Sequence, residues 1–235
     1  FDNRAKDHRL RARFPTPIRT DTIVSDGHFY INHRPIDQPS GDGWVQPPSG
    51  TYPQQEFSLV QDGARGLAVL NRGLPEIAAL RRDAGCAGLA LTLLRAVGWL
   101  SRDDFPSRGY QHAGPQLATP EAQCQGEQHF QYAVVPFAGD YIDARLKSLS
   151  QRYRTPVAAI QGVADHRIGG RSLLRKESSR TCVSAIKKHE SRDTLVIRLY
   201  NLTSEGVDET ITFGRLISAA WLVDLLEERF MELTS

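Results

Sequence analysis

Short strand-like segments separated by turn signals recur along most of this 235-residue chain. Asp26-Gly27 stands between two β-rich runs, residues 22–24 and 28–31, and residues 61–66 separate the runs 57–60 and 67–70. Apolar, β-branched runs bounded by turn residues are typical of antiparallel strands. The pattern therefore predicts two hairpins in the first third of the chain and favours a mainly β fold.

The opening stretch DNRAKDHRLRARFP is strongly basic, yet from Arg4 onward its side chains alternate with a period of two. A basic arm that grips nucleic acid would usually lack an apolar face and be rich in Gly, Ser or Pro. On a strand, successive side chains point to opposite faces. We therefore predict a half-buried strand with two distinct faces. Its apolar face would hold His8, Leu10, Ala12 and Phe14, and its charged face would hold Arg9, Arg11 and Arg13.

The rest of the chain contains further strand patterns and one helical pattern. Residues 38–53 are rich in Pro and Gly and predict an irregular loop, whereas residues 88–94 are apolar on both faces and predict a central strand. Residues 128–136 predict another strand, and residues 141–153 show helical spacing that ends before Thr155-Pro156. Four more strands are expected at residues 183–188, 194–200, 209–213 and 220–225.

These elements predict a domain organisation dominated by one large sheet structure. We expect an antiparallel β-sandwich at residues 1–160 with a connecting helix, a Gly- and Arg-rich loop at 161–180, and a small C-terminal β segment at 181–235. The chain begins at Phe1 and enters a strand pattern almost at once, so we expect it to be part of something longer.

The composition argues against several classes of function. The 29 basic and 27 acidic residues leave a net charge of +2, too small to steer the chain to nucleic acid or to an anionic membrane. The longest apolar run is far shorter than the ~20 residues of a membrane span. The scattered cysteines Cys86, Cys124 and Cys182 form no C-x-x-C pair, which favours a reducing, cytoplasmic setting, and Cys86 is expected to be a small buried thiol.

No motif for nucleophilic or nucleotide chemistry stands out. There is no G-x-S-x-G elbow and no Gly-rich phosphate loop. His28 and His33, five residues apart on an expected strand, would point to opposite faces and are poor metal ligands together. The remaining candidates are carboxylates in expected loops, for which turn formation or capping is the favoured interpretation. They are Asp26, Asp37, Asp42, Asp103, Asp104 and Glu121.

Aromatic side chains that could stack on a sugar are also present. Trp44, Tyr52, Trp99 and Tyr110 are the candidates, although Trp99 follows the most apolar strand directly and fits a core position at least as well.

Several stretches, in the same order along the chain, together resemble the C-terminal half of glycoside hydrolase family 38, the α-mannosidases. The stretches are NRAKDHRLRARFP, HRPIDQPSGDGWVQPPSGTYPQQEF, QDGARGLAVLNRGLPE, LALTLLRAVGWLSRDD, AGPQLATPEAQCQGEQHFQYAVVP and SAIKKHESRDTLVIRLYN. The resemblance spans roughly residues 2–225.

The resemblance implies a large sandwich of the galactose-mutarotase-like (supersandwich) kind and a final small β segment. It further implies that the zinc site and the nucleophilic Asp of a retaining, mannoside-cleaving enzyme lie in N-terminal barrel and helical domains outside this chain. This chain would then be inactive alone, hold no metal or catalytic residue, and contribute one wall of the substrate cleft. Its expected partners are those domains and an α-mannoside, with homo-oligomer formation also open.

Arg34 in the HRPID stretch is the candidate for reaching substrate, because a guanidinium suits hydroxyl or carboxylate recognition. A structural salt bridge is the favoured alternative for this side chain. A free-standing carbohydrate-binding sandwich is the chief alternative for the whole chain, and a nucleic-acid-binding protein is a third class that the net charge disfavours.

Overall fold

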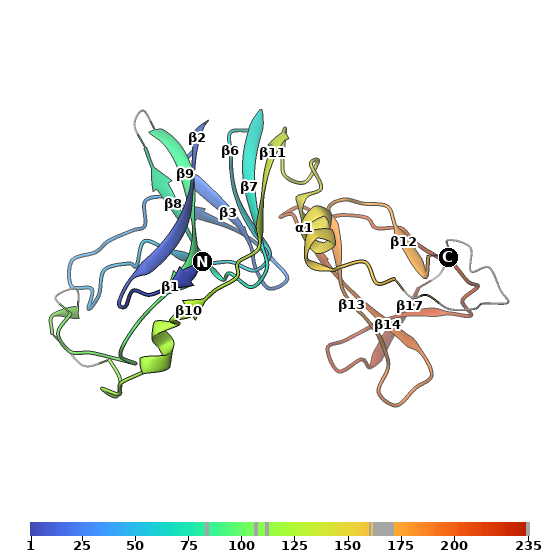
Figure 1. The fold of residues 1–235 in the computed structure, drawn as a ribbon. Helices are drawn as coiled ribbons and strands as arrows, with labels where there is room; N and C mark the ends of the chain where they lie inside the picture. The colour runs from blue at the N-terminus through green and yellow to red at the C-terminus, as the bar shows by residue number, and fades with distance from the viewer. Residues whose placement is uncertain (83–84, 106–107, 111–112, 160, 162–171, 234–235) are drawn as a thin grey trace. The chain divides into compact units, whose positions relative to one another are not determined.

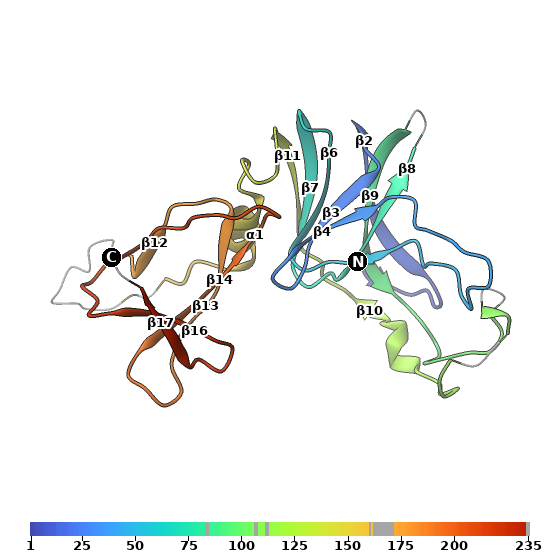
Figure 2. The ribbon, with the colours of Figure 1, turned by 180° about the vertical axis from the view of Figure 1, so that it is seen from behind.

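The computed structural model describes residues 1–82, 85–105, 108–110, 113–159, 161 and 172–233 (Figure 1). The described part divides into two compact units, residues 1–156 and 157–235. The predicted domain boundaries at 160 and 181 stay predictions. Antiparallel strands dominate both units, which confirms the predicted mainly β fold (Figures 1 and 2).

Two antiparallel sheets make up the first unit. One has five strands in the order β11-β7-β6-β3-β4, and the other has four in the order β2-β9-β8-β5. Strand β2 contacts β6 and β7, and β6 contacts β9, so the two sheets face each other as the layers of a sandwich. The five-stranded sheet contains β3 (Thr22–Asp26), β4 (Ile31–Pro35), β6 (Phe57–Gln61), β7 (Arg65–Asn71) and β11 (Tyr132–Ala138). The four-stranded sheet contains β2 (Arg9–Arg19), β5 (Tyr52–Pro53), β8 (Glu76–Arg81) and β9 (Cys86–Arg95).

The hydrophobic core fills the space between the two sheets. Strand β9 contributes alternate residues to it, Ala87, Leu89 and Leu91, as the period of two requires. The core cluster consists of Ile18, Ile23, Ile36, Val60, Val69, Leu74, Ile77, Ala87, Leu89 and Leu91. Phe14 from β2 and Phe130 pack against its rim.

The outer face of the five-stranded sheet is also covered. Strand β6 is buried along four successive residues, Phe57 to Val60, so both of its faces lie away from water. The one α-helix of the described residues, α1 (Leu146–Arg154), contacts β7 and buries Leu146. The described residues of this unit also form the short pair β1 (Asp2–Asn3) with β10 (Gly126–Glu127) and a 3-10 helix at Pro120–Gln123.

The described residues of the second unit form three two-stranded antiparallel ladders. Strand β13 (Thr181–Lys188) pairs with β14 (Leu195–Asn201), β12 (Leu174–Lys176) with β15 (Ile211–Phe213), and β16 (Ala220–Val223) with β17 (Arg229–Leu233). The four strands expected here are confirmed as β13 to β16. Strands β12 and β17 were missed, and β12 lies in a stretch whose Gly and Arg content predicted a loop.

Several expected elements begin or end elsewhere than predicted. The opening strand starts at Arg9, not Arg4, because Asp7 has a left-handed φ of 51° that interrupts the extended backbone. His8 therefore precedes the strand. The helix starts at Leu146, not Tyr141, because Arg145 also has a left-handed φ, of 52°. It ends at Arg154 as predicted.

Both predicted hairpins are present, with changes at their turns. In the first, residues 28–30 form the turn and β4 begins at Ile31, so His28 is not on a strand as expected. The second joins β6 and β7 as predicted. The central strand is confirmed as β9, which lies between β2 and β8. The predicted loop 38–53 ends in the two-residue strand β5, which Tyr52 and Pro53 form.

Candidate functional site

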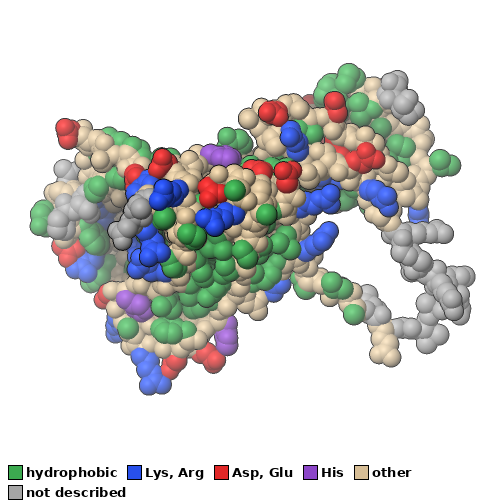
Figure 3. All heavy atoms as spheres, turned by 90° about the horizontal axis from the view of Figure 1, so that it is seen from above, with side chains coloured by type: hydrophobic (Ala, Val, Ile, Leu, Met, Phe, Trp, Pro, Cys, Tyr) green, Lys and Arg blue, Asp and Glu red, His purple; other side chains and the backbone are tan. Residues whose placement is uncertain are grey.

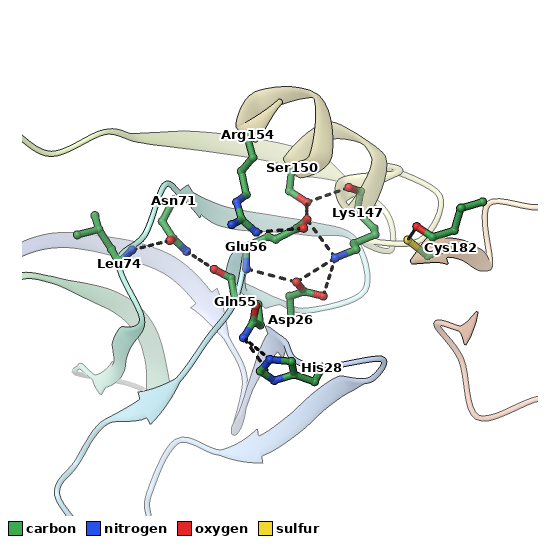
Figure 4. Close-up of polar contacts among 11 residues, drawn as sticks. Asp26, His28, Gln55, Glu56, Asn71, Leu74, Lys147, Ser150, Arg154 and Cys182 are labelled. Carbon is green, nitrogen blue, oxygen red and sulfur yellow. Dashed lines mark hydrogen bonds and ion pairs between the residues drawn. The ribbon is translucent and has the colours of Figure 1, made fainter. Parts of the chain in front are cut away.

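The densest group of buried charges in the described residues lies where α1 meets the five-stranded sheet, and we call it the Lys147 cluster (Figure 4). Asp26 ends β3, and Glu56 immediately precedes β6. Three residues of α1 face them because positions three, four and seven apart share one face of a helix. The cluster consists of Asp26, Glu56, Lys147, Ser150 and Arg154.

Lys147 lies between the two carboxylates. Its Nζ is 3.0 Å from Asp26 Oδ2, 3.2 Å from Asp26 Oδ1 and 3.0 Å from Glu56 Oε2. Ser150 Oγ donates to Glu56 Oε2 at 2.7 Å, and Arg154 Nη1 lies 3.2 Å from Glu56 Oε1. The backbone N–H of Glu56 also donates to Asp26 Oδ2, at 3.3 Å. Two positive and two negative groups therefore neutralise one another.

Burial controls the electrostatics of this cluster. Asp26 is 1% exposed, and the side chains of Lys147 and Glu56 are 11% and 15% exposed. Burial raises the pKa of Asp26 above its ordinary value, while the Lys147 ammonium opposes that rise. An ion pair withdrawn from water in this way gains little net free energy, but removing one partner leaves a buried charge uncompensated.

A second group of hydrogen bonds fixes the loops around the cluster. The backbone N–H of Gln55 donates to the Asp26 carbonyl at 3.0 Å, and Asn71 Nδ2 donates to the Gln55 carbonyl at 3.1 Å. The Leu74 N–H in turn donates to Asn71 Oδ1 at 2.9 Å. Gln55 Nε2 also lies 3.1 Å from His28 Nε2 in the adjacent turn (Figure 4).

This geometry suits a structural role rather than acid–base catalysis. A glycosidase needs two carboxyl groups that both face the sugar across a cleft. Here both carboxylates face the same lysine, and Asp26 is out of contact with solvent. The cluster can anchor α1 to β3 and to the start of β6.

Arg34, the predicted substrate contact, joins the two sheets at one edge of the sandwich. Its Nη1 donates to the Pro53 carbonyl at 3.0 Å, and its guanidinium lies 5.2 Å from the centroid of the Tyr52 ring. Tyr52 Oη returns a hydrogen bond of 2.6 Å to the Pro35 carbonyl. Since β4 and β5 are the edge strands of the two sheets, these contacts close that edge. We call them the Arg34 clasp.

The other candidate carboxylates do not converge with Asp26. Asp26 itself lies on a strand, not in a loop, and Glu121 belongs to the 3-10 helix. Asp37 is exposed and lies 2.6 Å from Arg81, whose hydrogen bond lowers the pKa of Asp37. Asp104 pairs with Arg102 two residues away. Asp37 and Asp104 therefore take part in ion pairs at the surface, a role other than the turn formation or capping favoured from the sequence.

The candidate aromatic platforms are spread over the surface. Trp44, Trp99 and Tyr110 are 53%, 45% and 66% exposed, so the core position considered for Trp99 is wrong. Cys86 is half-buried, not fully buried as expected. Sequence reasoning also missed Phe29 and Tyr30, which are 55% and 62% exposed at the tip of the β3–β4 hairpin.

Metal-binding geometry is absent from the described residues. Among them, no group of three or more His, Cys, Asp or Glu side chains could hold a metal ion. A structural or catalytic zinc site requires at least three convergent ligands from the protein. The described part of the chain therefore does not fit a zinc ion.

Sequence reasoning missed most of the Lys147 cluster. Glu56 and Lys147 carry no local motif, and Asp26 lies 121 residues from its lysine. The helical spacing of Lys147, Ser150 and Arg154 is the one sequence signal for this cluster. It predicts a polar helix face, but it does not show which residues that face contacts.

Comparison with known proteins shows that this chain is similar to parts of carbohydrate-active enzymes. Residues 181–235 match the family model described as the glycosyl hydrolases family 38 C-terminal beta sandwich domain. The chain is 27% identical over 210 residues to a protein of Halalkalibacterium halodurans that carries the name of a mannosylglycerate hydrolase. That alignment covers 88% of this chain and 21% of the relative.

Two solved structures extend the similarity over almost the whole chain. An alpha-mannosidase from Enterococcus faecalis matches with a TM-score of 0.80 and 29% identity, covering 97% of this chain and 24% of that one. A protein in the glycosyl hydrolase family 38 from the same species matches with a TM-score of 0.72 and 28% identity, covering 97% and 25%. These findings confirm the resemblance to the C-terminal region of glycoside hydrolase family 38. The chain spans about a quarter or less of the relatives it matches.

Proposed function

We propose that this chain is the non-catalytic C-terminal β region of a longer glycosidase that hydrolyses terminal α-mannosides. The observation that carries the proposal is the similarity of 97% of the chain, at a TM-score of 0.80, to an alpha-mannosidase of known structure. The Lys147 cluster supports a structural role, because its carboxylates are held by the chain's own cations.

The chemistry of the longer enzyme would be retaining hydrolysis. One carboxylate would attack the anomeric carbon and form a glycosyl-enzyme intermediate, and a second carboxyl group would serve first as acid and then as base. Both groups would come from outside this chain. Zinc, which would hold sugar hydroxyls in the longer enzyme, would also bind elsewhere, so no step runs through a metal on this chain.

This chain would contribute one wall of the substrate cleft, and Arg34 is the residue we propose to reach the sugar. Its guanidinium already donates to the Pro53 carbonyl, which fixes its position at the sandwich edge. A guanidinium carries five N–H donors, so others remain for a sugar hydroxyl or a carboxylate such as that of a glycerate group. None of Cys86, Cys124 and Cys182 forms a disulfide bond, which supports a cytoplasmic location. No described helix is long and apolar enough to span a membrane.

The substrate is tested on the longer protein. Purified enzyme is assayed with a chromogenic α-mannoside and with mannosylglycerate, before and after removal of zinc by a chelator, and proton NMR identifies the anomer released first. We expect zinc-dependent hydrolysis with retention of configuration. Hydrolysis of neither substrate, or release of the inverted anomer, would contradict the proposal.

A further inference from the structure

The two edges of the sandwich in the first unit differ. At one edge, the Arg34 clasp links β4 to β5. At the other edge, β2 and β11 form no sheet with each other, and the described contact between them is an edge-on aromatic pair. The ring centroids of Phe14 and Tyr132 are 5.8 Å apart, with an interplanar angle of 65°.

Strand β11 is an unusual edge strand because it carries no charged residue. Its sequence is YAVVPFA, and among the described strands it pairs with β7 alone (Figures 1 and 2). Tyr132 and Val134 are 38% and 41% exposed. Native edge strands are commonly protected by charges, and an exposed apolar edge favours pairing with another strand.

The register shows which backbone groups are free for such pairing. The Arg72 N–H donates to the Gln131 carbonyl, and the Gly139 N–H donates to the Ala64 carbonyl. In an uninterrupted antiparallel ladder, every second residue directs both its groups to the partner strand. The odd-numbered residues of β11 therefore bond to β7, and the even-numbered ones direct theirs outward. Those are Tyr132, Val134, Pro136 and Ala138, of which Pro136 supplies only a carbonyl.

Strand β2, an edge strand of the other sheet, is better protected than β11 against pairing with a further strand. It carries Pro15 and Pro17, which have no N–H to donate, together with four arginines. Its apolar face, including Leu10, Ala12 and Phe14, is only half-buried. In the view of Figure 3, hydrophobic side chains gather on the surface of the first unit.

We infer that β11 pairs, along Tyr132–Val134, with an extended apolar segment from the rest of the longer protein. This inference rests on the proposed function, since the relatives of known structure are about four times as long as this chain. The added strand would accept from the Tyr132 and Val134 N–H groups, and its side chains would cover those of Tyr132, Val134 and Phe14. This is recognition by strand addition.

Hydrogen exchange of the β11 amides tests the pairing without reference to activity. The 235-residue chain and the longer protein are compared, and we expect the Tyr132 and Val134 amides to exchange at least about tenfold more slowly in the longer protein. The amides of residues 133, 135 and 137, which bond to β7, serve as an internal reference. Equal exchange at Tyr132 and Val134 in both proteins would overturn the inference. If these amides exchange slowly in the short chain and the protection is lost on dilution, β11 pairs with a second copy of the chain. That result would also overturn the inference.

A substitution adds an independent readout. Val134→Lys places a charge on the edge, and in the short chain, where Val134 is 41% exposed, we expect little change in the unfolding temperature. In the longer protein the same change should lower the unfolding temperature and speed exchange at Tyr132. Val157→Lys, at a site 96% exposed, is the matched control and should change neither. A longer protein that hydrolyses mannosides with a freely exchanging β11 would overturn this inference alone, and a protected β11 without hydrolysis would overturn only the proposed function.

Discussion

Lys147 is the residue on which the anchoring of α1 depends most. Without its ammonium, Asp26 and Glu56 would be buried beside each other with the Arg154 guanidinium as the remaining nearby cation. Removing one partner of a buried ion pair costs about 3–5 kcal/mol. We therefore expect Lys147→Met to lower the free energy of unfolding by about that amount, measured by chemical denaturation. Lys188→Met, whose pair with Asp193 is exposed, is the control and should cost less than about 0.5 kcal/mol.

The cost of Lys147→Met should also depend on pH. Burial raises the pKa of Asp26, so the folded protein binds this proton more tightly than the unfolded chain does. The contribution of Asp26 to stability is therefore most favourable below its ordinary pKa of 3.8 and is lost as the pH rises through the folded value. The variant should recover part of the lost stability as the pH falls from 7 toward 4. A difference between variant and wild type that stays constant over that range would contradict the assignment of the penalty to Asp26.

Substitution of Arg34 distinguishes a structural role of this residue from a role in substrate binding. Arg34→Ala removes the hydrogen bond to the Pro53 carbonyl and the contact with Tyr52, which should cost about 1–2 kcal/mol of stability in the short chain. In the longer enzyme, a sugar contact predicts a rise in KM of about tenfold, which corresponds to about 1.4 kcal/mol. Tyr52→Phe is the control, because it opens the other half of the clasp without touching the guanidinium. An unchanged KM in Arg34→Ala would limit Arg34 to holding the sheets together.

At the scale of elements, Glu76 explains why β2 can carry several arginines on one face. Its carboxylate accepts from Arg95 Nη1 at 3.1 Å and from Thr92 Oγ1 at 2.6 Å, and it lies 3.3 Å from Arg9 Nη1. Burial and the neighbouring arginines, Arg9 first and then Arg13, lower the pKa of Arg11, and Glu76 opposes that shift. Part of the basic face is thus neutralised within its own sheet, an arrangement that the alternation along β2 could not reveal.

Substitution of Glu76 should make stability depend on salt. Glu76→Gln leaves the arginines of β2 and Arg95 to repel one another, and we expect a loss of about 1–2 kcal/mol at low ionic strength. The loss should shrink in about 1 M salt, where charges are screened within ~3 Å. Glu205→Gln, which breaks an exposed pair with Arg180, should cost less than about 0.5 kcal/mol at either ionic strength. Equal losses for Glu76→Gln at low and high salt would argue that packing, not charge, is responsible.

The start of α1 holds backbone strain that can be relieved. Arg145 precedes the helix with a φ of 52°, its side chain makes no capping hydrogen bond, and it is exposed. A left-handed conformation costs most residues about 1–2 kcal/mol, whereas Gly adopts it freely. Allowing for the greater flexibility of Gly in the unfolded chain, Arg145→Gly should stabilise the first unit by about 0.5–1 kcal/mol. Ser148→Gly, in the first turn of the same helix, should instead destabilise it by about 0.5 kcal/mol. Loss of stability in both variants would contradict the proposed strain.

The sequence predicted the type of most elements better than their ends. The alternation in β2, the two-sided burial of β9 and the end of α1 before Thr155-Pro156 were all readable, because local side-chain patterns and Pro act over a few residues. The starts of β2 and α1 were wrong because Asp7 and Arg145 have left-handed backbones. Asp adopts this conformation more often than most residues do, but still uncommonly, and Arg gives no signal for it.

At the scale of the whole molecule, the order of similar stretches along the chain predicted the resemblance to the C-terminal region of glycoside hydrolase family 38. Contacts between distant residues explain how the first unit is held together. The Lys147 cluster joins residues more than ninety positions apart, and no single sequence shows which charges meet across such a separation. The Arg34 clasp was equally hidden, since it depends on β4 and β5 being edge strands of different sheets. Arg34 was predicted to contact substrate, and the sequence did not show that this residue also contacts Pro53 and Tyr52.

The most direct test of a non-catalytic role is hydrolysis of a chromogenic α-mannoside by the 235-residue chain and by the longer protein, side by side at equal molarity with added zinc. We expect turnover by the longer protein and a rate for the short chain equal to that of buffer. Turnover by the short chain would contradict the central claim, and Asp26 and Glu56 would then need to be replaced one at a time to learn whether either carboxylate takes part in the chemistry.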